Sequence, residues 1–454
     1  MKKFLISIFL TYLRLAAKIQ LFKINPKIVA LTGSVGKTSL RQAITVVLKQ
    51  KFKIKQSIKA NSETGIPLDL LDLHPRDYSL GEWLKLAGLV LVQLLTNWRN
   101  YEIYIVELGI DDPFPPRNME YLLRFIHPDM SVFLRVALVH SEQFSKLLPK
   151  NKQLSIKEKE RFLLNQIAQE KGRILVDLPK NKIGIINYDD KLIWKEAQKS
   201  PAKIVGFGKK LKGEGIRIGS VNYQFSKKKQ FSAQNISTVF YFFDQNRKYQ
   251  LKLPLLIPEY YAYTLAAALV VGSQLDIGLE DSCRALEENF VLPPGRMSVF
   301  LGIKNSLLID SSYNASKEPT LGALDLLGKI PIKNKIVALG DMRELGEMAG
   351  IEHRQVAKKI NKVAKEVVLI GPLTKKYILP IVQSKKSVKW FINSWQAAAY
   401  LKRNLKKDSV ILIKGSQNMI FMEIVVEALL KNKKDRTKLC RRGKFWEKQR
   451  AKLN

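Results

Sequence analysis

The residues best suited to chemistry lie between positions 28 and 39, in the run IVALTGSVGKTS. A short apolar strand, residues 28–31, leads into a glycine-bearing turn, and a helical pattern follows to residue 49. In such a unit, backbone N–H groups and the helix N-terminus surround a polyphosphate, and a lysine supplies the counter-charge. The pattern predicts a nucleotide site made by Gly33, Ser34, Val35, Gly36, Lys37, Thr38 and Ser39.

Lys37 and Thr38 have separate predicted roles in this turn. Lys37 is placed to contact phosphate groups, and the hydroxyl of Thr38 is placed to reach Mg²⁺. Leu31 stands where the common G-x-x-x-x-G-K-[ST] loop has its first glycine, so the turn is a tighter variant. A plain strand-to-helix turn with an exposed lysine is the alternative, but the flanking strand and helix patterns favour the nucleotide site.

Length and composition limit the class of protein. A chain of 454 residues is too long for one core, so we expect two or three domains. Its hydrophobic fraction of 46% is typical of a globular protein. The two cysteines, Cys283 and Cys440, give no disulfide framework and favour a reducing cytoplasm. No apolar run reaches the ~18 residues of a membrane-spanning helix.

The formal net charge of +37 fits several kinds of anionic partner, and equally a general lysine bias without functional meaning. Lysines are scattered along the chain and become denser only beyond residue 430. No segment combines basic and aromatic residues in a nucleic-acid recognition motif. The sequence therefore indicates no specific nucleic-acid partner.

Strand and helix patterns alternate through most of the chain, which predicts an α/β fold. A first domain, residues 26–292, has strands at 103–108, 130–136 and 183–187, and hairpin spacing between 206 and 256. A Pro-Pro-Gly break at 293–295 begins a second domain, residues 293–430, with strands at 306–310, 335–340, 367–371, 388–391 and 410–414. In parallel sheets ligands meet the carboxyl ends of the strands. In the second domain these ends carry Asp310, Asp341, Lys414 and Ser416.

The two ends of the chain are interpreted separately. Residues 1–25 contain an amphipathic helix at 4–24, and residues 83–95 form a second apolar helix. Either helix packs on a domain or lies in an anionic membrane interface. The basic segment 431–454 is expected to be a solvated tail, disordered or partly helical.

Several further motifs follow the turn in a fixed order: NSETGIP at 61–67, IVELG at 105–109, His140, EKGR at 170–173, IINYDD at 185–190, PGR at 294–296, IDSSYNA at 309–315, LGDMRELG at 339–346, His353 and KGS at 414–416. In this order and spacing, over about residues 26–430, the chain resembles the Mur ligases. The likeness is greatest to members that add D-alanyl-D-alanine to a muramoyl-peptide precursor in peptidoglycan synthesis. It implies a central P-loop ATPase domain followed by a Rossmann-like C-terminal ligase domain.

The resemblance implies an ATP-dependent acid–amino-acid ligase with small-molecule substrates, active as a cytoplasmic monomer. A carboxylate is a poor electrophile, so transfer of the γ-phosphoryl group of ATP first makes an acyl phosphate. An amine then attacks, and the tetrahedral intermediate collapses to an amide and phosphate. Positioning and charge neutralisation dominate such catalysis.

The resemblance also assigns roles to single residues. Lys37 would contact the phosphates, Thr38 and Glu107 would hold a first Mg²⁺, and His140 would serve a second metal together with Lys171 as an N-carboxylated lysine. The catalytic set would be Lys37, His140, Lys171 and Asp310, with nucleotide contacts from Arg296, Asp310 and Asn314, and substrate contacts from Asn61, Asp341, Lys414 and Ser416. Structural alternatives remain open, above all a helix cap for Asp341 and a solvated Lys171.

Four departures from the family pattern bear on substrate recognition. Only 31 residues precede Thr32, so we expect the N-terminal UDP-binding domain of these ligases to be absent, supplied by another chain or replaced by the amphipathic helix. Tyr260 and Thr264 replace a His and an Asn of the adenine pocket, Ser311 replaces one of two aspartates, and Arg173 replaces a Glu. The rival functions are a folylpolyglutamate- or cyanophycin-type ligase and a non-catalytic nucleotide-binding scaffold.

Overall fold

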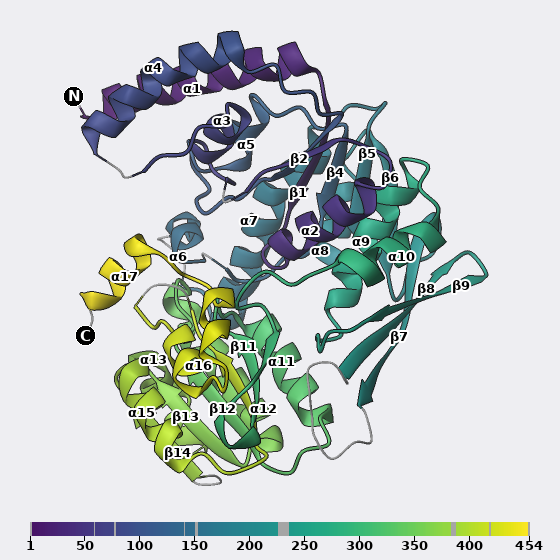
Figure 1. Cartoon of the computed structure of the whole chain (residues 1–454). Helices are drawn as coiled ribbons and strands as arrows, with labels where there is room; N and C mark the ends of the chain where they lie inside the picture. Colours follow the sequence, from purple (N-terminus) through teal and green to yellow (C-terminus); the bar gives the residue numbers. More distant parts are fainter. Residues whose placement is uncertain are drawn as a thin grey trace. The chain divides into compact units, whose positions relative to one another are not determined.

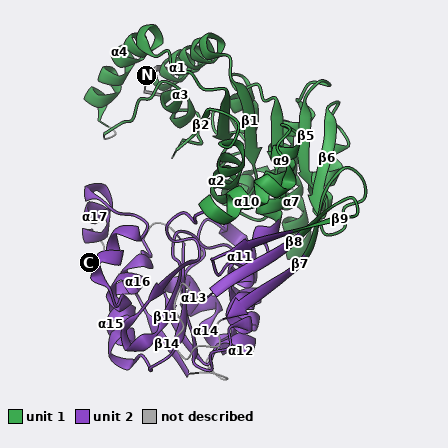
Figure 2. Cartoon of the chain, turned by 45° about the vertical axis from the view of Figure 1, so that its right-hand side comes forward, with its two compact units in different colours: residues 1–219, 242–249, 263–290 green, residues 220–241, 250–262, 291–454 purple. Residues whose placement is uncertain are grey.

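Alternating helices and strands build the whole chain (Figure 1). The computed structural model describes residues 2–58, 60–76, 79–139, 141–149, 153–225, 236–382, 387–416 and 419–452. The chain forms two compact units (Figure 2). Unit 1 comprises residues 1–219, 242–249 and 263–290, and unit 2 comprises residues 220–241, 250–262 and 291–454.

The first sheet has nine strands in the order β2-β3-β1-β4-β5-β6-β7-β8-β9. The neighbours from β2 to β7 pair in parallel. The predicted strands at 103–108, 130–136 and 183–187 and the hairpin spacing beyond 206 are confirmed. The strand bounds are β1 (Lys27–Thr32), β2 (Ile54–Gln56), β3 (Ile103–Glu107), β4 (Met130–Phe133), β5 (Ile183–Asn187), β6 (Lys203–Gly208), β7 (Gly215–Phe225), β8 (Ile236–Asp244) and β9 (Arg247–Leu253).

Strand β1 lies between β3 and β4, inside the parallel part of this sheet. Every residue of β1 after the first is buried, which explains its unbroken apolar sequence. The chain goes from β1 to one side of the sheet, through β2 and β3, and then returns to β4 on the other side. Such a reversal creates a crevice at the carboxyl ends of the strands, where doubly wound sheets bind ligands. The turn at 33–36 follows β1 at this point.

The helices that accompany the first sheet include a long α7, which begins with a capping box between Ser155 and Glu158. Helix α2 packs against β1, β2 and β3, and α7 packs against β1 and β4. The bounds are α2 (Lys37–Leu48), α3 (Gly65–Leu70), α5 (Met119–Leu123), α6 (Ser141–Phe144), η1 (Ser145–Leu147), α7 (Ile156–Val176), α8 (Lys191–Ala197), α9 (Tyr261–Ser273) and α10 (Leu279–Asn289).

The second sheet lies in unit 2 and has the order β10-β11-β15-β12-β13-β14. All five predicted strands are confirmed and pair in parallel, while β10 adds an unpredicted antiparallel edge. The strand bounds are β10 (Ser298–Leu301), β11 (Leu307–Ser311), β12 (Lys335–Gly340), β13 (Glu366–Ile370), β14 (Ser387–Phe391) and β15 (Val410–Lys414). The helices are η3 (Ile303–Asn305), α11 (Lys317–Lys329), η4 (Gly346–Met348), α12 (Ala349–Val363), α13 (Pro372–Tyr377), α14 (Leu379–Val382), α15 (Ser394–Asn404), α16 (Glu423–Leu429), η5 (Lys433–Lys438) and α17 (Lys444–Ala451).

The two apolar segments near the N-terminus are helices, as predicted: α1 (Lys2–Ile24) and α4 (Leu80–Thr96) lie side by side (Figure 1). The Tyr12 hydroxyl donates to the Ala87 carbonyl at 2.7 Å, and Lys23 Nζ donates to the Leu94 carbonyl at 2.7 Å. Leu13, Leu86 and other apolar residues form a small core beneath the pair. Among the described residues, no helix has both the length and the apolar character needed to cross a bilayer.

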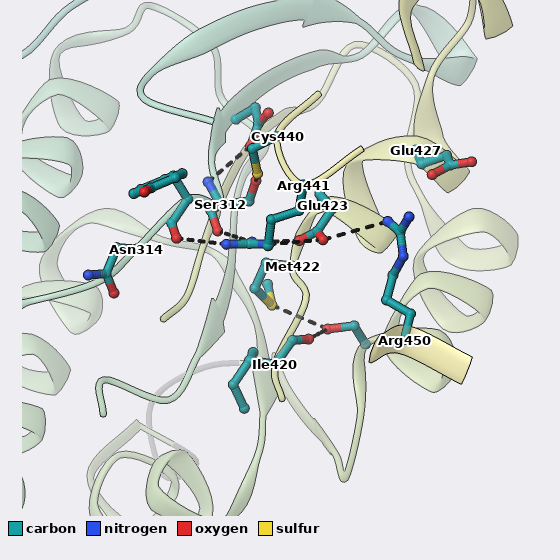
Figure 3. A network of polar contacts seen from close by, with 12 residues as sticks. Ser312, Asn314, Ile420, Met422, Glu423, Glu427, Cys440, Arg441 and Arg450 are labelled. Carbon is teal, nitrogen blue, oxygen red and sulfur yellow. Dashed lines mark hydrogen bonds and ion pairs between the residues drawn. The ribbon is translucent and has the colours of Figure 1, made fainter. Parts of the chain in front are cut away.

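The basic C-terminal segment is partly helical, as the sequence allowed, with η5 and α17, but the expectation of a solvated tail is wrong at residues 439–441 and at Arg450, which are buried. Arg441 is buried and forms an ion pair at 2.6 Å with the fully buried Glu423 of α16 (Figure 3). Leu439, Cys440 and Arg450 are buried beside it. The abundance of lysine and arginine concealed these contacts, because composition does not reveal a buried acidic partner.

Candidate active site

The turn between β1 and α2 is held in a shape that needs glycine. Gly36 has φ +90°, and a Cβ atom there would lie 2.7 Å from Leu134 Cδ2. Ser34 fixes the turn to the segment after β4: its N–H donates to the Arg135 carbonyl at 2.8 Å, and its hydroxyl donates to the Ala137 carbonyl at 3.0 Å. The turn is therefore anchored to β4 across the switch point of the sheet.

Lys37 and Thr38 open α2 directly after this turn. Lys37 Nζ donates to the Gly33 carbonyl at 2.7 Å, so the lysine folds back over the turn. The Thr38 hydroxyl donates to Glu107 Oε2 at 3.3 Å. Glu107 ends β3 and is buried. The structure thus brings together three of the predicted site residues, two from the start of α2 and one from the end of β3.

Arg41 also contacts Glu107, and sequence reasoning missed it. Its Nε lies 3.0 Å from Glu107 Oε1. Arg41 lies four residues after Lys37 and so shares one face of α2; that spacing was the available signal. The Thr38 hydroxyl and the Glu107 carboxylate supply adjacent oxygen donors of the kind that Mg²⁺ takes from proteins when phosphates complete its coordination. The donor set fits Mg²⁺, with Arg41 balancing the charge of Glu107.

Lys171 lies on α7 and is 3% exposed. Burial, together with the positive charge of Lys37, lowers the pKa of its ammonium to about 7, while Asp111 and Glu170 act in the opposite direction. Its Nζ donates to the Ile110 carbonyl over a long 3.4 Å. The predicted alternative of a solvated lysine is therefore wrong, and a large share of this amine is neutral near pH 7.

The backbone of Asn61 lies next to the segment that follows Glu107 at the carboxyl end of β3. Its carbonyl accepts from the N–H of Gly109, two residues beyond Glu107, at 2.9 Å. His140 lies outside the described residues. Within the described parts of the chain, no group of three or more His, Cys, Asp and Glu side chains could hold a metal by itself. Among the described residues, Thr38 and Glu107 are the predicted metal ligands that the structure brings together.

The other predicted residues gather in unit 2, at the carboxyl ends of β11 and β15. Asp310 is fully buried, and burial raises its carboxyl pKa to about 6. Its Oδ1 accepts from the Ser312 N–H at 3.0 Å, whereas Oδ2 has no hydrogen-bond partner among the described residues. Burial and Arg296 lower the pKa of the Lys414 ammonium to about 7. Lys414 Nζ donates to Ser311 Oγ at 3.1 Å and to the Asn314 carbonyl at 2.8 Å.

Asp341 and Ser416 follow β12 and β15 in the same unit. Asp341 Oδ1 accepts from the Thr374 N–H of α13 at 2.8 Å, which is the helix-capping arrangement that the sequence left open. Ser416 Oγ accepts from the Arg343 N–H at 2.9 Å and donates to the Ala315 carbonyl at 3.3 Å. The Ser416 side chain thus connects the loops after β11 and β12, and its N–H donates to the Asp341 carbonyl at 3.0 Å.

Arg296 and Asn314 flank the loop after β11. The Arg296 guanidinium lies 4.4 Å from the centre of the Tyr313 ring, and Tyr313 N–H donates to the Gly295 carbonyl at 3.0 Å. Asn314 Oδ1 accepts from the Ala315 N–H at 2.8 Å. The structure brings together Arg296, Asp310, Asn314, Asp341, Lys414 and Ser416 in unit 2, and Asn61, Lys37, Thr38, Glu107 and Lys171 in unit 1.

Comparison with known protein families matches two stretches of the chain, which include Lys171 of the first group and the residues of the second group. The Mur ligase middle domain matches residues 163–272, and the Mur ligase glutamate ligase domain matches residues 295–417. The chain belongs to the Mur ligase family. The predicted fold, with a central Mur ligase domain followed by a C-terminal one, is confirmed.

Curated relatives of this Mur ligase carry the name UDP-N-acetylmuramoyl-tripeptide–D-alanyl-D-alanine ligase. The relative from Rickettsia prowazekii is 26% identical over 407 residues, which cover 88% of this chain and 77% of that protein. The relative from Escherichia coli is 26% identical over 423 residues, which cover 90% of this chain and 78% of that protein.

Solved structures show the same fold. MurF from Thermotoga maritima in complex with ADP has a TM-score of 0.71 at 22% identity, covering 94% of this chain and 84% of the other. MurF from Acinetobacter baumannii has a TM-score of 0.72 at 19% identity, covering 93% of this chain and 81% of the other.

The departures from the Mur ligase pattern can now be placed. A Cβ atom at Gly36 would lie 3.6 Å from Thr264 Oγ1, so Thr264 borders the phosphate turn. Tyr260 instead packs against α11, where it leaves room only for glycine at position 322. Ser311 accepts the hydrogen bond from Lys414 described above, and Arg173 pairs with Glu120 at 3.1 Å. Two of the four replaced residues, Thr264 and Ser311, therefore lie next to candidate site residues.

Proposed function

We propose that this Mur ligase joins D-alanyl-D-alanine to a UDP-muramoyl-tripeptide in peptidoglycan synthesis, with cleavage of ATP to ADP and phosphate. Relatives with that name match about nine-tenths of the chain. The proposal rests on one observation: Lys37, Thr38 and Glu107 lie together at the carboxyl ends of β1 and β3, near the buried Lys171. This combination fits a reaction that begins at a terminal phosphate.

The proposed reaction has two steps. A carboxylate oxygen of the peptide attacks the γ-phosphorus of ATP, and the bond to the bridging oxygen breaks, which gives an acyl phosphate and ADP. The amine of the dipeptide then attacks the acyl carbon, loses a proton and expels phosphate as the amide forms. Lys37 would offset charge on the transferred group, and the N–H groups of the turn would hold the neighbouring phosphates.

We assign the metal and the modified lysine to the same place. Mg²⁺, when bound, would neutralise negative charge on the phosphates, held by Thr38 Oγ1 and Glu107, with His140 serving a second ion. The neutral amine of Lys171 can attack CO₂: a nitrogen–carbon bond forms, a proton leaves to water, and the carbamate offers an anionic oxygen. The lowered pKa of Lys171 supports this step, because an ammonium cannot react with CO₂.

In unit 2 we assign nucleotide contacts to Arg296, Asp310 and Asn314, and substrate contacts to Lys414 and Ser416, as well as to Asn61 of unit 1 and Asp341. The partnerless Oδ2 of Asp310 supports a contact there, since a buried carboxylate oxygen without a hydrogen bond is costly. Asp341 would act through its backbone, because its side chain caps α13.

The decisive experiment measures phosphate release with UDP-muramoyl-tripeptide and D-alanyl-D-alanine, each alone and both together. We expect release only with both, and Lys37→Ala should abolish it. Release with glutamate and a folate instead would favour a folylpolyglutamate-type ligase. ADP binding without acceptor-dependent release would identify a non-catalytic scaffold.

We further propose that the protein is a cytoplasmic monomer that touches anionic membrane through the outer face of α1 and α4. Large apolar side chains are exposed along both helices; Phe22 is 89% exposed and Leu95 is 77% exposed. Helix α1 contains no acidic residue, and the exposed Lys18 lies among its apolar side chains. An apolar face with a cationic rim is typical of helices in a membrane interface.

Flotation with vesicles tests this contact. Wild-type protein should float with phosphatidylglycerol-rich vesicles and less with phosphatidylcholine vesicles. Phe22→Glu combined with Leu95→Glu should stop flotation, whereas Ile392→Glu, a matched change of an exposed apolar residue in unit 2, should not. Equal flotation of all three proteins would refute the contact, and sedimentation equilibrium on the same samples would check the monomer.

A further inference from the structure

The C-terminal segment 439–450 makes contacts in unit 2 that the family match, which ends at residue 417, does not include. Arg441 is the centre of these contacts (Figure 3). Its Nε donates to Glu423 Oε1 at 3.0 Å, and its Nη2 donates to Glu423 Oε2 at 2.6 Å. A buried, bidentate arginine–carboxylate pair fixes the orientation of the guanidinium plane.

The remaining donors of Arg441 hold the loop after β11. Nη2 also donates to the Ser312 carbonyl at 2.6 Å, and Nη1 donates to the Tyr313 carbonyl at 2.8 Å. The neighbouring Cys440 Sγ lies 3.4 Å from Ser312 Oγ. Two consecutive backbone carbonyls are therefore oriented by one side chain that comes from 129 residues further along the chain.

The same loop is held from its other flank by Lys414, through Ser311 Oγ and the Asn314 carbonyl. Tyr313 belongs to this loop, and the Arg296 guanidinium stacks on its ring. Gly295 completes the arrangement: it has φ +71°, and a Cβ atom there would lie 2.9 Å from Cys440 Sγ. The C-terminal segment thus packs against both stretches that carry the proposed nucleotide contacts Arg296 and Asn314.

We propose that Arg441 is a positioning residue that holds the 312–314 loop, and with it Arg296 and Asn314, in the arrangement that binds the nucleotide. The inference rests on the proposed function for its kinetic consequence. A lysine in place of Arg441 keeps the charge. Its compact ammonium cannot form a bidentate pair with Glu423 and also donate to both loop carbonyls. The loop carbonyls would then lose a fixed partner.

The test compares Arg441→Lys with Arg442→Lys, the same change at the next residue, whose partner is Glu427. We expect Arg441→Lys to raise the KM for ATP by about tenfold to a hundredfold with a smaller change in kcat, since small misplacements of binding groups have effects of this size. Arg442→Lys should leave both constants near wild type. An unchanged KM for ATP with only a lowered melting temperature would overturn the proposal.

Hydrogen exchange provides a readout independent of the reaction. Amides of residues 312–315 should exchange faster in Arg441→Lys than in Arg442→Lys, whether or not the protein ligates the expected substrates. If the wild type shows no ligation, the proposed function fails, but the exchange result still tests whether Arg441 holds the 312–314 loop. Equal exchange of these amides in both variants would refute the positioning role of Arg441. Glu423→Gln, which keeps the shape of the partner, should give the same changes to a smaller degree and serves if Arg441→Lys does not fold.

Discussion

Two buried lysines, Lys171 in unit 1 and Lys414 in unit 2, have the same ionisation and different surroundings. Burial lowers the pKa of each to about 7. Lys414 makes two hydrogen bonds of 3.1 and 2.8 Å to the loop after β11, whereas Lys171 has one long contact of 3.4 Å. A lowered pKa alone therefore does not distinguish the two lysines: hydrogen bonds hold the Lys414 ammonium against the loop, whereas the Lys171 amine has only the long contact to Ile110 among the described residues, which is the basis for proposing the new bond there.

The largest expected effect concerns Lys171. Lys171→Ala should lower phosphate release by about a thousandfold, because loss of a preorganised charged ligand has effects of this order. Formate or acetate should restore part of the activity, since a small carboxylate can occupy the place of the carbamate that we propose on Lys171. Steady-state rates with 0–200 mM added salt, in steps of about 50 mM with chloride as the control, would measure this. Rescue by chloride to the same degree would contradict the assignment.

Lys414 should behave differently. Lys414→Met is expected to lower kcat/KM by about tenfold to a hundredfold, because the loop that it holds loses two hydrogen bonds. Small carboxylates should not restore activity, as no carbamate is made there. The same kinetic assay applies, and a carboxylate rescue equal to that of Lys171→Ala would erase the distinction between the two lysines.

The pH dependence of stability tests the lowered pKa that both lysines share. The ordinary pKa of 10.5 applies in the unfolded chain, so between pH 7 and 10.5 the unfolded state binds more protons than the folded state. The free energy of unfolding therefore rises with pH in this window, by at most about 1.4 kcal/mol per pH unit for each lysine. Melting temperatures from pH 7 to 9 without bicarbonate should rise less in Lys414→Met than in the wild type. Parallel plots of melting temperature against pH for the variant and the wild type would show that the pKa of Lys414 is not lowered and that this lysine is charged in the folded protein.

The smallest expected effect is at Arg41, which pairs with Glu107 in unit 1. Arg41→Met should lower the Mg²⁺ concentration for half-maximal activity by about threefold, because removing a nearby positive charge strengthens the attraction of the carboxylate for a cation. Magnesium titrations of wild type and variant, with Arg442→Lys as a control for a remote arginine, would measure the shift. A higher magnesium requirement would mean that Arg41 orients Glu107 instead of competing with the metal.

Residues within a local motif could be predicted from the sequence. Lys37 and Thr38 follow from the spacing of the turn, and Glu107 follows from the resemblance of the IVELG motif to the Mur ligases. Strands β1, β3, β4 and β5 of the first sheet and the five parallel strands of the second were also predictable, because buried parallel strands have continuous apolar sequences, whereas β2 and β9 were not predicted. The antiparallel β10 was missed, since a short edge strand carries a weak pattern.

Residues whose role depends on a distant partner could not be predicted. Nothing near Arg441 in the sequence indicates that it meets Glu423 and the Ser312 carbonyl, and a charge count favoured a solvated tail. Arg41 is similar, because its contact with Glu107 depends on how α2 packs against β3. The cap made by Asp341 was one of two alternatives, and the sequence held no information to choose between them.

The placement of the two cysteines makes them probes of motion within each unit. Cys283 lies in unit 1 and Cys440 in unit 2, both thiols are buried, and burial raises the pKa of each to about 12. A protonated, enclosed thiol reacts slowly with alkylating reagents. The rate at which each cysteine is labelled would thus report how often its own unit opens, with no mutation or attached dye.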